Sequence, residues 1–245
     1  MKTLNLLTRG IAIGALLLSP ALVRAGIVGS PHDFSTESWN VKASDQNSVC
    51  GTCHTPHHAD SSVVPLWAHT TTSSSFTMYN NANVPAANLQ ATVDPQPAGP
   101  SKACLSCHDG TVAVNQYGGA LQGPIPVPIT NSAKLGTDLT HTHPISLTYD
   151  NNIAGIGAGK DKFLFNPDTR QVLQPDNQPT FVTGNDMTVN GFLLNGNHRL
   201  ECTSCHDVHN QMGTPFDITF NPKLVKVVGT QAGKGSLLCR SCHDK

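Results

Sequence analysis

Apolar residues are gathered at the start of the chain and thinly spread after it. A short apolar run at 11–18 follows two basic residues, and Val23-Arg24-Ala25 then forms a small-x-small cleavage site. This order is typical of a secretory signal peptide, so we expect residues 1–25 to be removed on export. Residues 26–245 hold no second apolar run long enough to span a membrane. The pattern predicts an exported protein whose residues 26–245 form a single domain.

Beyond residue 25 the hydrophobic pattern predicts only short elements. Helix-compatible sequence at 101–109 and 234–244 predicts two short helices, and β-branched or alternating residues predict short strands at 180–183, 187–194 and 224–228. Polar, glycine-rich or proline-rich stretches that favour loops separate them, at 70–75, 94–100, 118–128 and 150–160. We therefore expect a mostly irregular, coil-rich fold with a few short helices and strands.

The composition bears on what can stabilise the interior of such a fold. Only 38% of the chain is hydrophobic and 5% aromatic, with 21 glycines and 17 prolines, whereas soluble domains are usually about 45–50% apolar. The charged fraction of 13% excludes a highly charged disordered tail and a coiled coil. Without residues 1–25 the 15 basic residues fall to 12, against 16 acidic ones, which argues against a nucleic-acid partner. Something other than side-chain packing is expected to fill the interior.

All eight cysteines fall in four C-x-x-C-H motifs. They are motif I (Cys50, Cys53, His54), motif II (Cys104, Cys107, His108), motif III (Cys202, Cys205, His206) and motif IV (Cys239, Cys242, His243). This is the attachment signature of haem c: two thiols on one helical turn bind one porphyrin, and the histidine binds its iron as the proximal ligand.

Three other readings of the cysteines fit less well. A zinc site does not require histidine after every second cysteine, and a disulfide scaffold does not restrict every cysteine to one spacing. A thioredoxin-like redox pair explains one motif and not four. The sequence therefore predicts four covalently bound haems as the core around which the chain wraps, and a largely unfolded chain without them.

Eight further histidines supply candidates for the opposite side of each iron. Only three methionines remain after residue 25, so we expect bis-histidine ligation. His57 and His209 each lie three residues after a proximal histidine, about 10 Å of chain at most, so each is expected to ligate a different haem from its neighbour. The motif order also indicates an imperfect duplication, about 26–130 and 131–245, which nominates His32 and His143 as the other two distal ligands. The reserves are His69, His58, His141 and His198.

The motifs in their context resemble the multihaem c-type cytochromes of metal-reducing bacteria. The resemblance rests on CHTPHH with PLWAH, CLSCHDGTVAVN, HPISLTYD, LECTSCHDVHN and LCRSCHDK, and runs from about residue 31 to the C-terminus. The chain is most similar to the tetrahaem, outer-surface kind that polymerises into extracellular filaments. That implies bis-histidine haems in alternating parallel and T-shaped pairs, and a histidine from one subunit, here His32, that can ligate a haem of the next.

These observations predict an exported electron carrier rather than an enzyme. Its partners would be copies of itself, redox proteins and extracellular acceptors, and its place the extracellular or outer surface, with the periplasm as the alternative. Two other functions stay open: a monomeric periplasmic shuttle, and a multihaem reductase with one open haem site. An accessory subunit of a haem-bearing complex is a further possibility.

Overall fold

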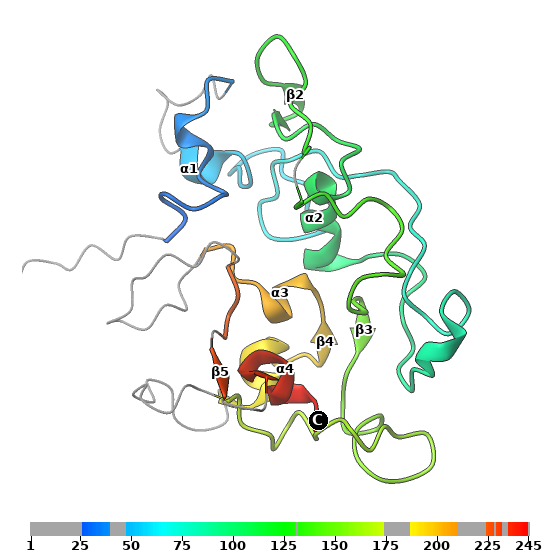
Figure 1. The fold of residues 1–245 in the computed structure, drawn as a ribbon. Coiled ribbons are helices and arrows are strands. Elements are labelled where there is room, and N and C mark those ends of the chain that lie inside the picture. Colours follow the sequence, from blue (N-terminus) through cyan, green and yellow to red (C-terminus); the bar gives the residue numbers. More distant parts are fainter. Residues whose placement is uncertain are drawn as a thin grey trace, which may run out of the picture.

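The computed structural model describes residues 26–39, 48–130, 132–173, 187–209, 224–227, 229–231 and 235–244. The predicted export signal at 1–25 and the predicted strand at 180–183 lie outside these residues. In the part of the chain that is described, helices and strands are short, and most residues lie in turns or irregular segments (Figure 1). The expected duplication stays a prediction.

Each α-helix carries part or all of one cysteine motif. The helices are α1 (Ser48–Gly51), α2 (Gly99–His108), α3 (Cys202–Cys205) and α4 (Leu237–Cys242). In Figure 1, α3 lies between α2 above it and α4 below it. Three single helical turns also lie among the described residues: the 3₁₀ turns η1 (Phe34–Thr36) and η2 (Pro85–Ala87) and the π-helical turn η4 (Val189–Leu193).

The described strands form three antiparallel pairs of two residues each. They are β1 (Gln116–Tyr117) with β2 (Ala120–Leu121), β3 (Leu147–Thr148) with β4 (Arg199–Leu200), and β5 (Thr230–Gln231) with β6 (Gly235–Ser236). The β3–β4 pair joins distant parts of the chain, with Leu147 opposite Leu200. Because β4 runs directly into α3, this pairing fixes the start of motif III.

The helix predicted at 101–109 is confirmed as α2, which begins two residues earlier. Pro100 lies in its first turn, where the missing N–H needs no partner. The helix ends at Asp109, whose N–H donates to the carbonyl of Leu105 at 3.0 Å. The helix predicted at 234–244 is confirmed over Leu237–Cys242.

The strand predicted at 187–194 is wrong, because this segment is the turn η4. The Thr188 hydroxyl accepts a hydrogen bond from the N–H of Gly191 at 3.0 Å and starts the turn. Val189 and Leu193 lie four residues apart and are both buried on one side, a helical spacing that alternation alone does not separate from a strand. Of the strand predicted at 224–228, the described residues 224–227 contain an isolated bridge between Val225 and His206.

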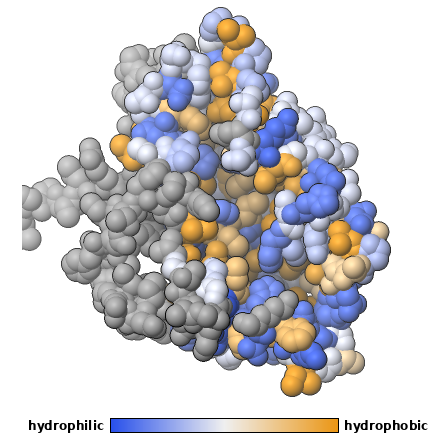
Figure 2. Space-filling view, in the orientation of Figure 1, coloured by the Kyte–Doolittle hydropathy of each residue, from blue (hydrophilic) through white to orange (hydrophobic). Residues whose placement is uncertain are grey.

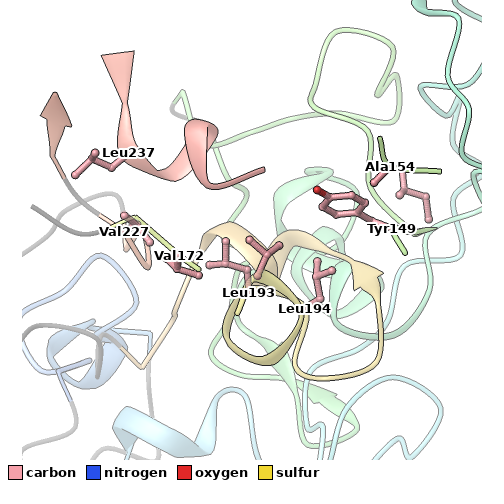
Figure 3. Packing of buried hydrophobic residues seen from close by; sticks show 9 residues of the cluster. Tyr149, Ala154, Val172, Leu193, Leu194, Val227 and Leu237 are labelled. Carbon is pink, nitrogen blue, oxygen red and sulfur yellow. The ribbon is translucent and has the colours of Figure 1, made fainter. Parts of the chain in front are cut away.

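Two clusters of buried apolar side chains support the motif helices. The larger cluster lies around η4 and α4 (Figure 3) and comprises Leu147, Tyr149, Ala154, Val172, Val189, Leu193, Leu194, Val227 and Leu237. The smaller cluster comprises Phe76, Met78, Leu105 and Leu139. Side-chain packing thus contributes more to the interior than the composition led us to expect.

On the face of the molecule shown in Figure 2, apolar and polar residues are intermingled. Ile156 is 94% exposed and Ile125 is 70% exposed. None of the described helices is long and apolar enough to cross a membrane.

Candidate functional site

Each C-x-x-C-H motif forms a single helical turn. In motifs I, III and IV the N–H of the histidine donates to the carbonyl of the first cysteine, at 2.8, 3.0 and 2.9 Å. Motif II forms the last turns of α2. Residues three and four apart share one side of a helix, so in every motif the two thiols and the imidazole can reach one ligand together.

All eight cysteines are free thiols. Burial is the main cause that raises the pKa of Cys53 and Cys205 to about 11, and that of Cys107 and Cys242 to about 12. Among the described residues, no group of three or more His, Cys, Asp or Glu side chains is placed to hold a metal ion. A haem iron needs only two protein ligands, one on each side, so that finding does not bear on bis-histidine ligation.

The four motifs follow one another in space in the order of the sequence. The neighbouring Cys53 of motif I adds to the raised pKa of Cys107 in motif II. Cys104 of motif II is hydrogen-bonded to Cys202 of motif III, which is the largest cause of its raised pKa. Cys205 of motif III in turn adds to the raised pKa of Cys242 in motif IV. Ligands bound at consecutive motifs would therefore be close neighbours.

The motif histidines in the first half of the chain are held through one ring nitrogen. Nδ1 of His54 donates to the carbonyl of Pro65 at 3.1 Å, and Nδ1 of His108 donates to that of Ala133 at 2.8 Å. A histidine that binds a metal usually donates its other ring N–H in this way, which fixes the tautomer and the orientation of the ring. Both side chains are thus prepared to bind iron through Nε2.

Three motif histidines have a second imidazole beside them. The ring centres are 6.2 Å apart for His54 and His209, 5.9 Å for His108 and His32, and 6.1 Å for His243 and His143. An imidazole nitrogen lies about 2 Å from a bound metal and its ring centre about 1 Å further away, so rings on opposite sides of one iron have centres about 6 Å apart. The three pairs have the spacing of axial ligands.

His143 and His32 differ in how their second nitrogen is placed. Nδ1 of His143 donates to the carbonyl of Pro144 at 2.9 Å, as in the proximal histidines. Nδ1 of His32 is buried without a hydrogen-bond partner. Burial, followed by the nearby His108 and His206, lowers the pKa of His32 to about 4. His32 is therefore neutral at neutral pH, which is the form that binds metals.

His32 and His209 come to these positions from other parts of the chain. His32 lies beside His108, in motif II of its own chain. That His32 can ligate a haem of a neighbouring subunit stays a prediction. His209 lies three residues after motif III but beside the histidine of motif I, in agreement with the expectation that it would approach a different motif. His57 was expected to approach a different motif in the same way, but the structure does not place it beside another motif histidine. His57 is exposed, and its hydrogen bonds join its main chain to the Thr55 hydroxyl.

The reserve histidines are occupied or exposed. His58 and His141 are exposed, and His198 donates to Asp168 at 2.7 Å. His69 is only 2% exposed, and its ring nitrogens lie 2.9 Å from the carbonyl of Thr70 and 3.0 Å from that of Ala113. Its Nε2 is also 3.3 Å from Sγ of Cys107. His69 thus packs against motif II from the side, and burial lowers its pKa.

Sequence reasoning missed Glu201, which joins motifs II and III. Its carboxylate is buried, and it accepts hydrogen bonds from Ser101 at 2.5 Å, Ser146 at 3.0 Å and Arg199 at 3.2 Å. Ser101 begins the buried face of α2 and also accepts from the N–H of Cys202 at 3.0 Å. The available signal was that, among the four residues that directly precede a motif, only Glu201 is charged.

Arg170 also lies beside a motif. Its Nη2 donates to the carbonyl of Arg240, inside motif IV, at 3.2 Å.

Comparison with protein-family models finds no match to the chain, and a search of the curated proteins finds none either.

Proposed function

We propose that this protein is an exported tetrahaem c-type cytochrome that carries electrons along a chain of bis-histidine haems. The observation that carries the proposal is the set of three imidazole pairs with ring centres 5.9–6.2 Å apart, in each of which a motif histidine lies beside a histidine that the sequence nominated as a distal ligand without assigning it to a motif. When bound, a haem supplies a one-electron ferric–ferrous couple.

The pairs assign both protein ligands of three haems. The motif I haem would be held by His54 and His209, the motif II haem by His108 and His32, and the motif IV haem by His243 and His143. For motif III, His206 would provide one ligand, and His57 remains our candidate for the other. Because His57 is exposed, its side chain would have to move from the surface to bind this haem.

The residues have three separate tasks in this function. The cysteines would anchor the porphyrins, and the paired imidazoles would supply two protein ligands to each iron, which favours electron transfer over substrate binding at iron. The contacts between consecutive motifs, such as that of Cys104 with Cys202, keep neighbouring haems close. The protein sets the potentials through burial and nearby charge.

The experiment that tests this function is a haem count with ligand typing on the purified native protein. Four covalent haems per chain, all low-spin in electron paramagnetic resonance, are the expected result. Fewer than four would overturn the tetrahaem assignment, and a high-spin ferric signal would favour the reductase with one open haem.

The polymeric form is a proposal that rests on the resemblance of the motifs to those of filament cytochromes. Negative-stain microscopy of native secreted material should show filaments. Particles that remain monomeric at every concentration would leave the periplasmic shuttle as the function.

A further inference from the structure

Arg170 is held rigidly against motif IV. The guanidinium carbon lies 3.9 Å from the centre of the Phe165 ring, and Nη2 donates to the carbonyl of Arg240. Its main chain is held as well, since its N–H donates to Asn166 at 2.9 Å and its carbonyl accepts from Val189 at 2.8 Å. The side chain is half-buried, so its position is set by the fold.

Two further contacts hold this segment to the same motif. The N–H of Leu173 donates to the hydroxyl of Ser241 at 2.9 Å. The Tyr149 hydroxyl donates to the carbonyl of Phe165, the residue on which Arg170 stacks. Arg170 is therefore positioned by both the larger hydrophobic cluster and the backbone of motif IV.

The charge of Arg170 lacks a matching anion in the described part of the chain. The ion pairs there join His198 to Asp168 and Arg199 to Asp94 and Glu201, and none includes Arg170. Its Nε is buried without a hydrogen-bond partner. A half-buried cation with an unused donor is costly unless an anion approaches it.

The proposed haem of motif IV would bring such an anion. A porphyrin of haem c carries two propionate groups, and a guanidinium binds carboxylates through two parallel hydrogen bonds. Cys242 of this motif packs against the larger cluster, and the Tyr149 hydroxyl lies 3.5 Å from its carbonyl oxygen.

We propose that Arg170 binds a propionate of the haem at motif IV and raises the reduction potential of that haem. A cation near the iron disfavours the ferric state more than the ferrous state, which carries one positive charge less. Neutralising the propionate acts in the same direction. This inference rests on the proposed function, because it requires a haem on Cys239 and Cys242.

The test compares three variants of the four-haem protein by spectroelectrochemical titration and by redox-difference infrared spectroscopy of the propionates. In Arg170→Gln we expect one of the four one-electron components to move to lower potential and one carboxylate band to shift. Arg170→Lys, which keeps the charge and loses the planar fork, should show a smaller change in potential and the same kind of band shift.

Lys162→Gln is the matched control, because Lys162 is also a cation over a phenylalanine ring. Its Nζ lies 5.0 Å from the centre of the Phe163 ring, and both residues are exposed. It should titrate like the parent protein. The inference is overturned if both Arg170 variants match Lys162→Gln in potentials and in carboxylate bands. If Arg170→Gln does not accumulate with four haems, the infrared band of Arg170→Lys decides alone. A haem count below four in the parent protein would instead overturn the proposed function.

Discussion

At the scale of single residues, the histidines divide by what occupies their ring nitrogens. His54, His108 and His143 donate through Nδ1 to a main-chain carbonyl and keep Nε2 for a ligand. His69 has both nitrogens near carbonyls, and His198 is held by a carboxylate. Among these five histidines, the hydrogen-bond partner of the second nitrogen separates candidate iron ligands from structural histidines, which residue counts alone do not. His32 has no partner at Nδ1 and is a candidate because its ring lies beside that of His108.

His209 provides the clearest test of the ligand assignment. His209→Ala should convert one of the four haems from low spin to high spin, because the iron held by His54 then loses its second imidazole. His141→Ala is the control, since His141 is exposed, and it should stay fully low-spin. A low-spin His209→Ala protein, measured by electron paramagnetic resonance, would show that His209 is not a ligand.

Glu201 should be important for stability. In Glu201→Ala, the donors Ser101, Ser146 and Arg199 lose their shared buried acceptor, and we expect the free energy of unfolding of the haem-loaded protein to fall by about 2–4 kcal/mol. Glu37 is exposed, so Glu37→Ala should change it by less than about 0.5 kcal/mol. Urea unfolding measures both, and equal effects would contradict the role assigned to Glu201.

At the scale of elements, each helix is short because its task is to present one motif. A helix of four to six residues is not stable alone, so α1, α3 and α4 depend on what packs against them. The longest, α2, buries Leu105 in the smaller cluster with Phe76, Met78 and Leu139. Met78 is thereby used for packing.

The contribution of α2 can be measured at Leu105, which is fully buried. Leu105→Ala should lower the free energy of unfolding by about 2–5 kcal/mol, through lost burial and the cavity that remains. Leu135→Ala makes the same change at a side chain that is 46% exposed, and we expect less than about 1 kcal/mol there. If the two variants unfold at the same urea concentration, α2 is not supported by this cluster.

At the scale of the whole molecule, the described residues contain two small clusters of buried apolar side chains and three strand pairs of two residues each. Within the described residues this is little apolar packing, and the entropy of ordering the chain opposes it. Four haems, each bound by two thioether bonds and two imidazoles, would supply the missing contacts. The order of the motifs in space would give electrons a continuous path from motif I to motif IV.

The chain without haem should therefore be largely unfolded. With every motif cysteine replaced by serine, we expect far-ultraviolet circular dichroism typical of coil and rapid proteolysis throughout, whereas the haem-loaded protein resists the protease. A compact, protease-resistant haem-free chain would contradict this. It would mean that the larger cluster around Tyr149 and Leu193 folds by itself.

The sequence by itself predicted the attachment chemistry, because the C-x-x-C-H spacing brings two thiols and an imidazole to one side of a helical turn. It also predicted the low content of regular structure, from glycine, proline and sparse apolar residues, and the helices at motifs II and IV. Local spacing was enough for these features. Local spacing was not enough at 187–194, because a helical turn and a strand would bury the same apolar residues there and the spacing does not distinguish them.

Only the tertiary structure decided which distant groups meet. His209 beside His54, His32 beside His108 and His143 beside His243 are each separated by at least 76 residues. Such pairs depend on how irregular segments cross, and no periodicity in the chain encodes those crossings. The same holds for Glu201 between motifs II and III and for Arg170 at motif IV, since the burial of a charge depends on what the whole fold places around it.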